Sequence, residues 1–360
     1  MAHPLRVVQL LGAKNAGGAE TFFIRLMVAF AKRPHLIQAL PIVRKHSWAA
    51  RRLAEEGIPF ETIRFGGWWD LLGKRRVARL TKAFKADVVM SWMNRATAFV
   101  PRGPWVKVAR LGGYYKLKYY INKVKYLVGN TQDLCGYLKR EGWPEEHVFC
   151  LGNFIPEPPE DWREAEEEVR HTWGVPPGRR MFLMAARLHQ VKGWDVLFAA
   201  TAALVKQGQD VGIWVLGDGP LREALAVEAD KLGIGDRVVF VGWADNVTPY
   251  AAATYAWVVA SRQETLGNSV LDAWVHHVPL VSTKTQGPLQ LMTDGKDGLF
   301  FEIDDVRGLE KALHHLLTDG ALAASLAKAG YDSFVKDYAE EVIVTQFIEF
   351  YRKLMNKEGA

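Results

Sequence analysis

Short apolar runs of strand length alternate along the chain with longer segments whose apolar residues recur at helical spacing. In the first half the strand-like runs are LRVVQLL, IQALPIV, ADVVMSWM, WVKVARL, KYLVGN and HVFCLGN. In the second half they are RMFLMAARL, VGIWVLGDG, RVVFVGWA, YAWVVAS, VPLVSTK and GLFF. Strands that alternate with helices predict parallel sheets with helices on both faces. The pattern therefore predicts an α/β protein.

A change of composition after residue 153 predicts a domain boundary. The stretch NFIPEPPEDWREAEEEVR has prolines at 156, 158 and 159, followed by an acidic, helix-like run. We therefore expect two doubly wound, Rossmann-like domains, at 1–155 and 160–335. The end of the chain, 336–360, has the spacing of an amphipathic helix, which we expect to pack back toward the first domain.

The net charge of +6 conceals an uneven distribution. Residues 1–150 hold 26 Lys and Arg against 10 Asp and Glu, a net +16, and the remaining residues hold 20 against 30, a net −10. A basic half can face nucleic acid, anionic lipid head groups or an acidic acceptor. The alternative is that the charge serves only solubility.

The sequence gives no sign of a membrane span or a secretion signal. The best apolar candidate, FFIRLMVAFA, is interrupted by Arg25 and falls short of the roughly 18 residues that a membrane helix needs. The N-terminal apolar run is short and indicates a buried strand. Two cysteines, Cys135 and Cys150, without metal-ligand spacing fit a reducing compartment. We therefore expect a cytoplasmic protein.

The residues that follow each strand are informative, because doubly wound sheets bind ligands beyond the carboxyl ends of their strands. After the first strand, LGAKNAGGAETF places Gly17 and Gly18 before a helix. Glycine lets the backbone approach a ligand, and a helix N-terminus attracts anions. The spacing differs from the dinucleotide pattern G-x-G-x-x-G. A ligand-binding turn and a merely flexible turn are equal alternatives here.

Two cations follow the first strand of the second half. In MAARLHQVKGWD, the first acidic residue after Arg187 and Lys192 is Asp195. Arginine offers a planar fork and lysine a compact charge, so the two can hold a diphosphate. The alternative is a pair of surface cations. After the next strand, GDGPLREAL forms a tight turn in which Gly217 can wall a nucleotide pocket.

The stretch SRQETLGNSVLDAW follows the strand YAWVVAS and opens a helix near Gly267 or Asn268. Side chains on a helix lean toward its N-terminus, so Asp272 is expected to point to the space that Glu264 faces. Amides at a helix start favour phosphate, while carboxylates accept hydrogen bonds from hydroxyl groups. Together they suit a ligand with a phosphate and a sugar. The alternative is that the acids only complement the helix dipole.

Taken in order, the motifs GGAE, ARLHQVKGWD, GDGPLREAL and SRQETLGNSVLDAW resemble those of the retaining glycosyltransferases of family 4 (glycosyltransferase group 1). The resemblance runs across nearly the whole chain. It implies the GT-B fold, with two Rossmann-like domains facing across a cleft. It assigns acceptor binding to the first domain and nucleotide-sugar binding to the second. The sequence departs from the family at Asp272, where a glutamate is usual, in WVHHVPLV, and at Gln290.

The resemblance also implies a role for each matching residue. Arg187 and Lys192 would hold the donor diphosphate, and Glu264 would contact the transferred sugar. The remaining donor contacts would come from Gly17, Gly18, Gly217, Leu266, Gly267, Asn268 and Asp272. Positive groups aimed at a departing nucleoside diphosphate stabilise the transition state. This chemistry needs no metal, and the sequence has no Asp-x-Asp motif or histidine cluster; the adjacent His276 and His277 suit a helix end.

The resemblance implies transfer with retention of configuration, from a nucleoside-diphosphate sugar of the UDP or GDP type and without a further cofactor. The acceptor would be a glycan or glycolipid, as in bacterial lipopolysaccharide or envelope synthesis. Basic segments of the first domain, GKRRVARLTKAFK and RLGGYYKLKYYINKVKY, suit such an acceptor at an anionic membrane surface. They are equally typical of a solvated helix face. Candidate acceptor residues are Glu20, Arg95, Tyr114 and Lys116.

Three other functions are open on the sequence alone. A sugar-nucleotide epimerase of the same fold would isomerise the donor without an acceptor. A non-catalytic protein would bind the nucleotide sugar without turning it over. Nucleic-acid binding rests only on the basic half and predicts steep salt dependence; the motifs favour no nucleic-acid partner.

Overall fold

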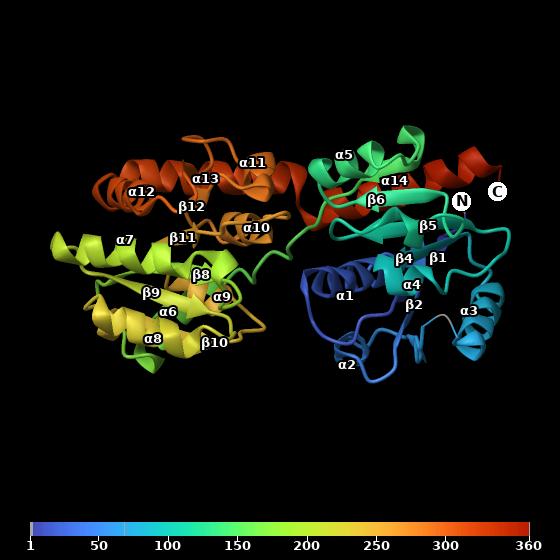
Figure 1. Cartoon of the computed structure of the whole chain (residues 1–360), viewed down its shortest axis with the longest axis horizontal. Coiled ribbons are helices and arrows are strands. Elements are labelled where there is room, and N and C mark those ends of the chain that lie inside the picture. The colour runs from blue at the N-terminus through green and yellow to red at the C-terminus, as the bar shows by residue number, and fades with distance from the viewer. Residues whose placement is uncertain (1–2, 68, 360) are drawn as a thin grey trace. The chain divides into compact units, whose positions relative to one another are not determined.

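The computed structural model describes residues 3–67 and 69–359, and the chain divides into two compact units (Figure 1). The first unit combines Met1–Phe154 with Glu340–Ala360, and the second is Ile155–Ala339. Each unit is a parallel sheet with helices on both faces, which confirms the α/β class expected from the alternating pattern.

The first unit contains a seven-stranded sheet in the order β3-β2-β1-β4-β5-β6-β7. Its strands are β1 (Leu5–Leu11), β2 (Ile37–Arg44), β3 (Glu61–Ile63), β4 (Val88–Trp92), β5 (Val106–Leu111), β6 (Tyr126–Gly129) and β7 (Val148–Cys150). Its helices are α1 (Gly18–Ala31), α2 (Trp48–Glu55), α3 (Leu71–Ala83), α4 (Met93–Thr97), α5 (Gln132–Arg140) and α14 (Glu340–Glu358), with 3-10 turns at Leu117–Tyr119 and Glu145–His147.

Alternate residues of each strand enter opposite cores of this unit, because successive side chains point to opposite faces of a sheet. Val7 and Leu11 of β1 pack with α1, α2 and α14 on one face, whereas Val8 and Leu10 pack with α3 and α4 on the other. The C-terminal helix contributes Phe347 and Tyr351 to the first of these cores. It begins at Glu340, and not at 336, because α13 continues to Asp337.

The second unit contains a six-stranded sheet in the order β10-β9-β8-β11-β12-β13. Its strands are β8 (Arg180–Ala185), β9 (Val211–Leu216), β10 (Val238–Gly242), β11 (Ala256–Val259), β12 (Leu280–Thr283) and β13 (Leu299–Phe301). Its helices are α6 (Ala165–Thr172), α7 (Trp194–Lys206), α8 (Arg222–Lys231), α9 (Thr248–Ala252), α10 (Asn268–Val275), α11 (Gln286–Leu291), α12 (Val306–Thr318) and α13 (Gly320–Asp337), with 3-10 turns at Trp162–Glu164, Gln190–Lys192 and Gly235–Arg237.

The second sheet is also buried on both faces. Phe182 and Met184 of β8 pack with α7, α8 and α12, and Met181 and Leu183 pack with α10 and α13 on the opposite face. Strands buried on both sides are continuously apolar, which is why the sequence revealed them as uninterrupted runs. The two cores fix the strand ends, and the loops after those ends carry the candidate site.

Candidate active site

The second unit places two of the expected motifs at one point of its sheet. β8 and β11 are neighbours, and the strand order runs from β8 to β10 on one side and from β11 to β13 on the other. Such a reversal leaves a crevice at the carboxyl ends of the two central strands, where ligands of doubly wound sheets bind. Arg187 and Lys192 follow β8, and Glu264 follows β11.

Lys192 and Glu264 form an ion pair at this point. Lys192 Nζ donates a hydrogen bond to Glu264 Oε2 at 2.6 Å, and the two side chains retain only 20% and 18% of their exposure. The expectation that no acid lies near Lys192 holds only along the sequence, because folding brings in an acid from 72 residues away. The half-buried pair is screened less by water than a surface pair would be.

Arg187 precedes Lys192 in the same loop after β8, and its side chain is exposed. Its carbonyl accepts hydrogen bonds from Trp194 Nε1 at 3.1 Å and from the amide of His189 at 2.8 Å. Across the described residues, no carboxylate lies within ion-pair distance of its guanidinium. A fixed backbone with an exposed, uncompensated guanidinium suits an anionic ligand.

Two glycines allow the backbone of the strand-end loops to pack closely against neighbouring carbonyl groups. Gly193 has φ +70°, and a Cβ there would lie 2.0 Å from the carbonyl oxygen of Ala260. Gly217 has φ +134°, and a Cβ there would lie 2.1 Å from the carbonyl oxygen of Ala186. Only glycine fits such close backbone contacts at positive φ. The position of Gly217 thus has a packing explanation, and its expected contact with a nucleotide remains a prediction.

The loop that carries Glu264 leads into α10, whose first residue is Asn268, as the sequence predicts. The N-cap is Gly267, which supplies no side-chain acceptor for the first-turn amides. The Glu264 carbonyl accepts a hydrogen bond from the amide of Gly287 at 2.7 Å, so α11 fixes the loop. Leu266 lies in this loop, and Asp272 lies one turn inside α10, partly exposed.

The two adjacent histidines close α10, as expected. His276 is 2% exposed; its Nδ1 lies 2.7 Å from the Asp272 carbonyl, and its Nε2 lies 3.1 Å from Thr248 Oγ1. A neutral ring that donates from Nδ1 and accepts at Nε2 satisfies both contacts. Burial lowers the pKa of His276, and also that of His277, which stacks on Tyr331 with 3.8 Å between ring centroids.

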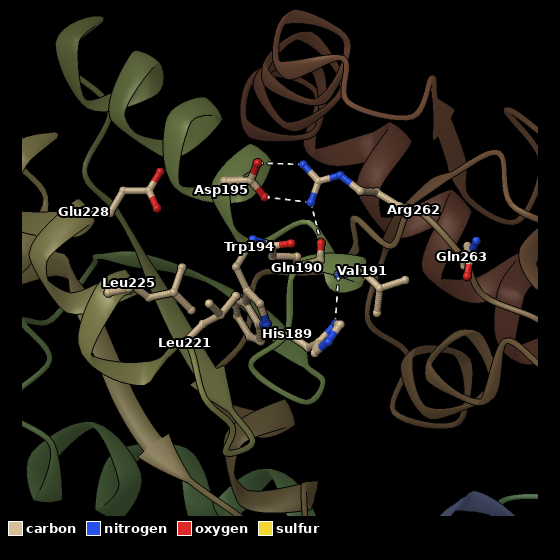
Figure 2. A pocket seen from close by; sticks show the side chains of 11 residues that line it. His189, Gln190, Val191, Trp194, Asp195, Leu221, Leu225, Glu228, Arg262 and Gln263 are labelled. Carbon is tan, nitrogen blue, oxygen red and sulfur yellow. Dashed lines mark hydrogen bonds and ion pairs between the residues drawn. The ribbon is translucent and has the colours of Figure 1, made fainter.

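Arg262 ties the two strand-end loops to each other, and sequence reasoning missed it. Its amide donates to the Val191 carbonyl at 2.8 Å, and its guanidinium donates to the Gln190 carbonyl (Figure 2). The guanidinium also forms a two-pronged pair with Asp195, at 3.1 and 2.6 Å, and contacts Asp304 at 2.7 Å. These partners lie far away in the sequence, so no local motif reveals them.

A cavity of about 720 Å³ adjoins Arg262 on the side of α7 and α8 (Figure 2). Its lining combines the apolar side chains of Leu221 and Leu225 with the carboxylates of Asp195 and Glu228. Burial raises the pKa of Glu228, and the nearby charge of Asp195 raises it further. This cavity lies beside the 3-10 turn that ends at Lys192.

The first unit collects other expected residues at its own reversal of strand order, between β1 and β4. Gly17 is the N-cap of α1, which begins at Gly18. A Cβ on Gly17 would lie 2.6 Å from Glu20 Oε2, and one on Gly12 would lie 3.0 Å from Arg95 Cγ. Burial raises the pKa of Glu20, which favours a protonated carboxyl more than usual.

Tyr114 and Lys116 lie in the loop between β5 and β6, and both are exposed. Tyr114 donates a hydrogen bond to Asp133 and packs edge-on against Tyr137 at 5.1 Å. Burial, followed by the Asp133 contact, raises its pKa to about 12. Burial raises the pKa of its neighbour Tyr115, which the sequence did not single out, and the charge of Glu20 raises that pKa further.

Within the described residues, no three His, Cys, Asp or Glu side chains are grouped closely enough to hold a metal ion. Over the same residues, no helix combines the length and apolar character that a membrane crossing requires.

Comparison with known proteins shows the family to which the chain is similar. Residues 179–319 match the family described as Glycosyl transferases group 1. Two proteins of Rhizobium meliloti (strain 1021) are each 30% identical: the lipopolysaccharide core biosynthesis glycosyltransferases LpsE, over 92% of this chain and 95% of the relative, and LpsD, over 93% and 95%.

Among solved structures, Anabaena HepE in complex with UDP and glucose has a TM-score of 0.80 at 18% identity, covering 97% of this chain and all of that one. A glycosyltransferase from Rickettsia africae has a TM-score of 0.85 at 14% identity, covering 98% and 99%. At such identities the likeness concerns the fold, which is GT-B. Given full-length relatives at 30% identity, this chain belongs to the group 1 glycosyltransferases and is a glycosyltransferase enzyme.

Proposed function

We propose that this enzyme transfers a sugar from a nucleoside-diphosphate sugar to a glycan or glycolipid acceptor in the synthesis of the lipopolysaccharide core. The observation that carries the donor part is the Lys192–Glu264 pair at the strand reversal of the second unit, with the exposed Arg187 in the same loop after β8 as Lys192. The acceptor class is supported by two relatives named as lipopolysaccharide core enzymes.

In this proposal, Arg187 and Lys192 hold the diphosphate, and the start of α10 adds the amides of Leu266, Gly267 and Asn268. Glu264 then accepts hydrogen bonds from the transferred sugar, while Asp272 binds the ribose. Cations aimed at the leaving group stabilise the charge that grows as the glycosidic bond breaks. Arg262 keeps the two loops in register, so it acts as a positioning residue.

We further infer retention of configuration without a metal ion. Double-displacement enzymes place two carboxylates about 5 Å apart, one of them as nucleophile. In the proposed donor site, Glu264 is already paired with Lys192 and Asp272 is assigned to the ribose, so neither carboxylate serves as a nucleophile. Departure and attack on the same face of the sugar fits that arrangement. The anomeric proton coupling of the product, measured by NMR with EDTA present, tests both statements: an inverted product or an absolute need for metal would refute them.

Binding of a nucleoside diphosphate is the first expected result. Calorimetric titration with UDP, GDP, ADP and CMP should show one diphosphate that binds, and the Arg187→Ala variant should bind it at least about tenfold more weakly, because a charge-assisted contact is lost. The matched control is Arg222→Ala, an exposed cation on α8 of the same unit. If every nucleotide fails to bind a folded protein, the proposed donor site is wrong.

We also propose that the first unit docks on an anionic membrane surface through α3. Trp69, Leu71 and Leu72 at its start are 74%, 62% and 78% exposed, and the helix then carries Arg75 and Arg79 on exposed positions. Exposed apolar side chains beside cations suit the boundary between head groups and acyl chains.

Sedimentation with vesicles tests this surface. The unmodified protein should sediment with vesicles rich in anionic lipid at low salt and release at high salt, because surface charges are screened. Leu71→Ser/Leu72→Ser should weaken sedimentation several-fold, whereas Val227→Ser, at an exposed apolar residue of α8, should not. Equal binding to neutral vesicles, or no binding at low salt, would argue against the proposal.

A further inference from the structure

A cation follows each of three neighbouring strands of the first unit, within three residues of the end of the strand. Lys14 follows β1, Lys45 follows β2 and Arg64 follows β3 directly. Because β3, β2 and β1 are adjacent and parallel, these residues lie along one edge of the sheet. All three side chains are exposed, and within the described part of the chain none has an acid at ion-pair distance.

The backbone holds these three strand ends together. The amide of Trp48 donates to the Lys14 carbonyl at 2.9 Å, and the amide of Lys45 donates to the Ile63 carbonyl at 2.8 Å. Between them, His46 adopts φ +55°, which is uncommon for a residue other than glycine. The cations are therefore fixed at their bases and close to one another.

Two cavities open at this edge and share Lys45 and Thr62. The first, of about 730 Å³, is lined by Lys14, Lys45, His46 and Arg51 among others, and has no Asp or Glu in its lining. The second, of about 430 Å³, is lined by Lys45, Arg64 and Arg76. Its one aspartate, Asp70, accepts hydrogen bonds from the amides of Gly66 and Gly73, so it caps α3.

Two other cations that line these cavities, Arg51 and Arg76, differ from the three after the strand ends. Arg76 pairs with Glu61 at 2.8 Å, and Arg51 lies 3.6 Å from Glu55. Three uncompensated cations, gathered around concave surfaces without a usable acid, create a positive potential that attracts an anion.

We propose that this basic trough, formed by Lys14, Lys45, His46 and Arg64, binds a phosphate or carboxylate carried by the acceptor. The inference rests on the proposed function, because it assigns the trough to the acceptor of the same reaction. An anionic sugar fits better than a neutral one: lysine and arginine donate charge-assisted hydrogen bonds to phosphate and carboxylate oxygens. The volume accommodates one or two sugar rings and so suits a glycan.

Ligand-detected NMR with three small probes tests the trough. Glucose 6-phosphate, glucuronate and glucose are titrated at low salt into the full chain carrying Arg187→Ala, which reduces anion binding to the second unit. At least one of the anionic probes should bind roughly tenfold more tightly than glucose. Lys45→Ala/Arg64→Ala should remove that advantage, whereas Arg79→Ala/Lys82→Ala, with the same loss of charge on exposed positions of α3, should keep it.

The outcomes separate this inference from the proposed function. Equal affinity for all three probes, or an equal loss in the two double variants, overturns the trough. Nucleotide binding by Lys45→Ala/Arg64→Ala, measured without the Arg187→Ala change, shows that the variant is folded and that the donor site is independent. A chain that binds no nucleotide but still prefers anionic sugars would refute the donor site and leave the trough standing.

Discussion

The Lys192→Ala variant is expected to transfer sugar at least about a hundredfold more slowly than the unmodified enzyme, the usual effect of removing one preorganised donor from a developing negative charge. Lys192 is 20% exposed and lies 2.6 Å from Glu264, so it acts where water screens little. Its loss removes a charge from the proposed diphosphate site and leaves the Glu264 carboxylate without its partner. Turnover of the donor that the titration identifies is the measurement.

A positive charge at position 192 is not by itself expected to restore the full rate of sugar transfer. Lys192→Arg should recover only part of the activity, because a planar fork cannot occupy the position of a compact ammonium group. The matched control is Lys284→Ala, which breaks an exposed pair with Glu302 in the same unit and should leave turnover within about twofold. Should Lys192→Ala keep near-normal turnover, the pair would be structural and the leaving group would be stabilised elsewhere.

The fold could be predicted from the sequence to a large extent. All twelve expected strands are present. They could be recognised in the sequence because strands buried on both faces leave continuous apolar runs. The thirteenth, β3, was missed: its three residues, Glu61–Ile63, contain one buried apolar side chain and therefore no pattern. The ordered motifs also indicated the family and the enzymatic class, which the relatives confirm.

The site was accessible to sequence reasoning only where its residues follow strand ends. Arg187, Lys192 and Glu264 could be located from such positions, and their roles stay predictions. The contact between Lys192 and Glu264 could not be foreseen, because it depends on β8 and β11 being adjacent. The same holds for Arg262, whose partners Asp195 and Asp304 come from opposite directions along the chain. The basic trough likewise arises from the order of three strands.

Gly193→Ala should have the largest effect on stability, lowering the free energy of unfolding by about 2–5 kcal/mol. The left-handed conformation at φ +70° costs a non-glycine residue about 1–2 kcal/mol. Displacing the Ala260 carbonyl, 2.0 Å from the added methyl group, costs a further 1–3 kcal/mol or so, as for an overpacked core. Denaturant titration measures the sum.

Gly208→Ala separates the two contributions. Gly208 has φ +82°, and a Cβ there would meet nothing within 4 Å, so this variant should lose only the conformational part. The difference between the variants then measures the contact between the loops after β8 and β11. Since Gly193 adjoins Lys192, and Ala260 leads toward Glu264, Gly193→Ala should also weaken nucleotide binding in the folded protein, whereas Gly208→Ala should not. Equal losses of stability in both variants would mean that the loops move apart at little cost in free energy. The close backbone contact between Gly193 and Ala260 would then not be what positions the Lys192–Glu264 pair.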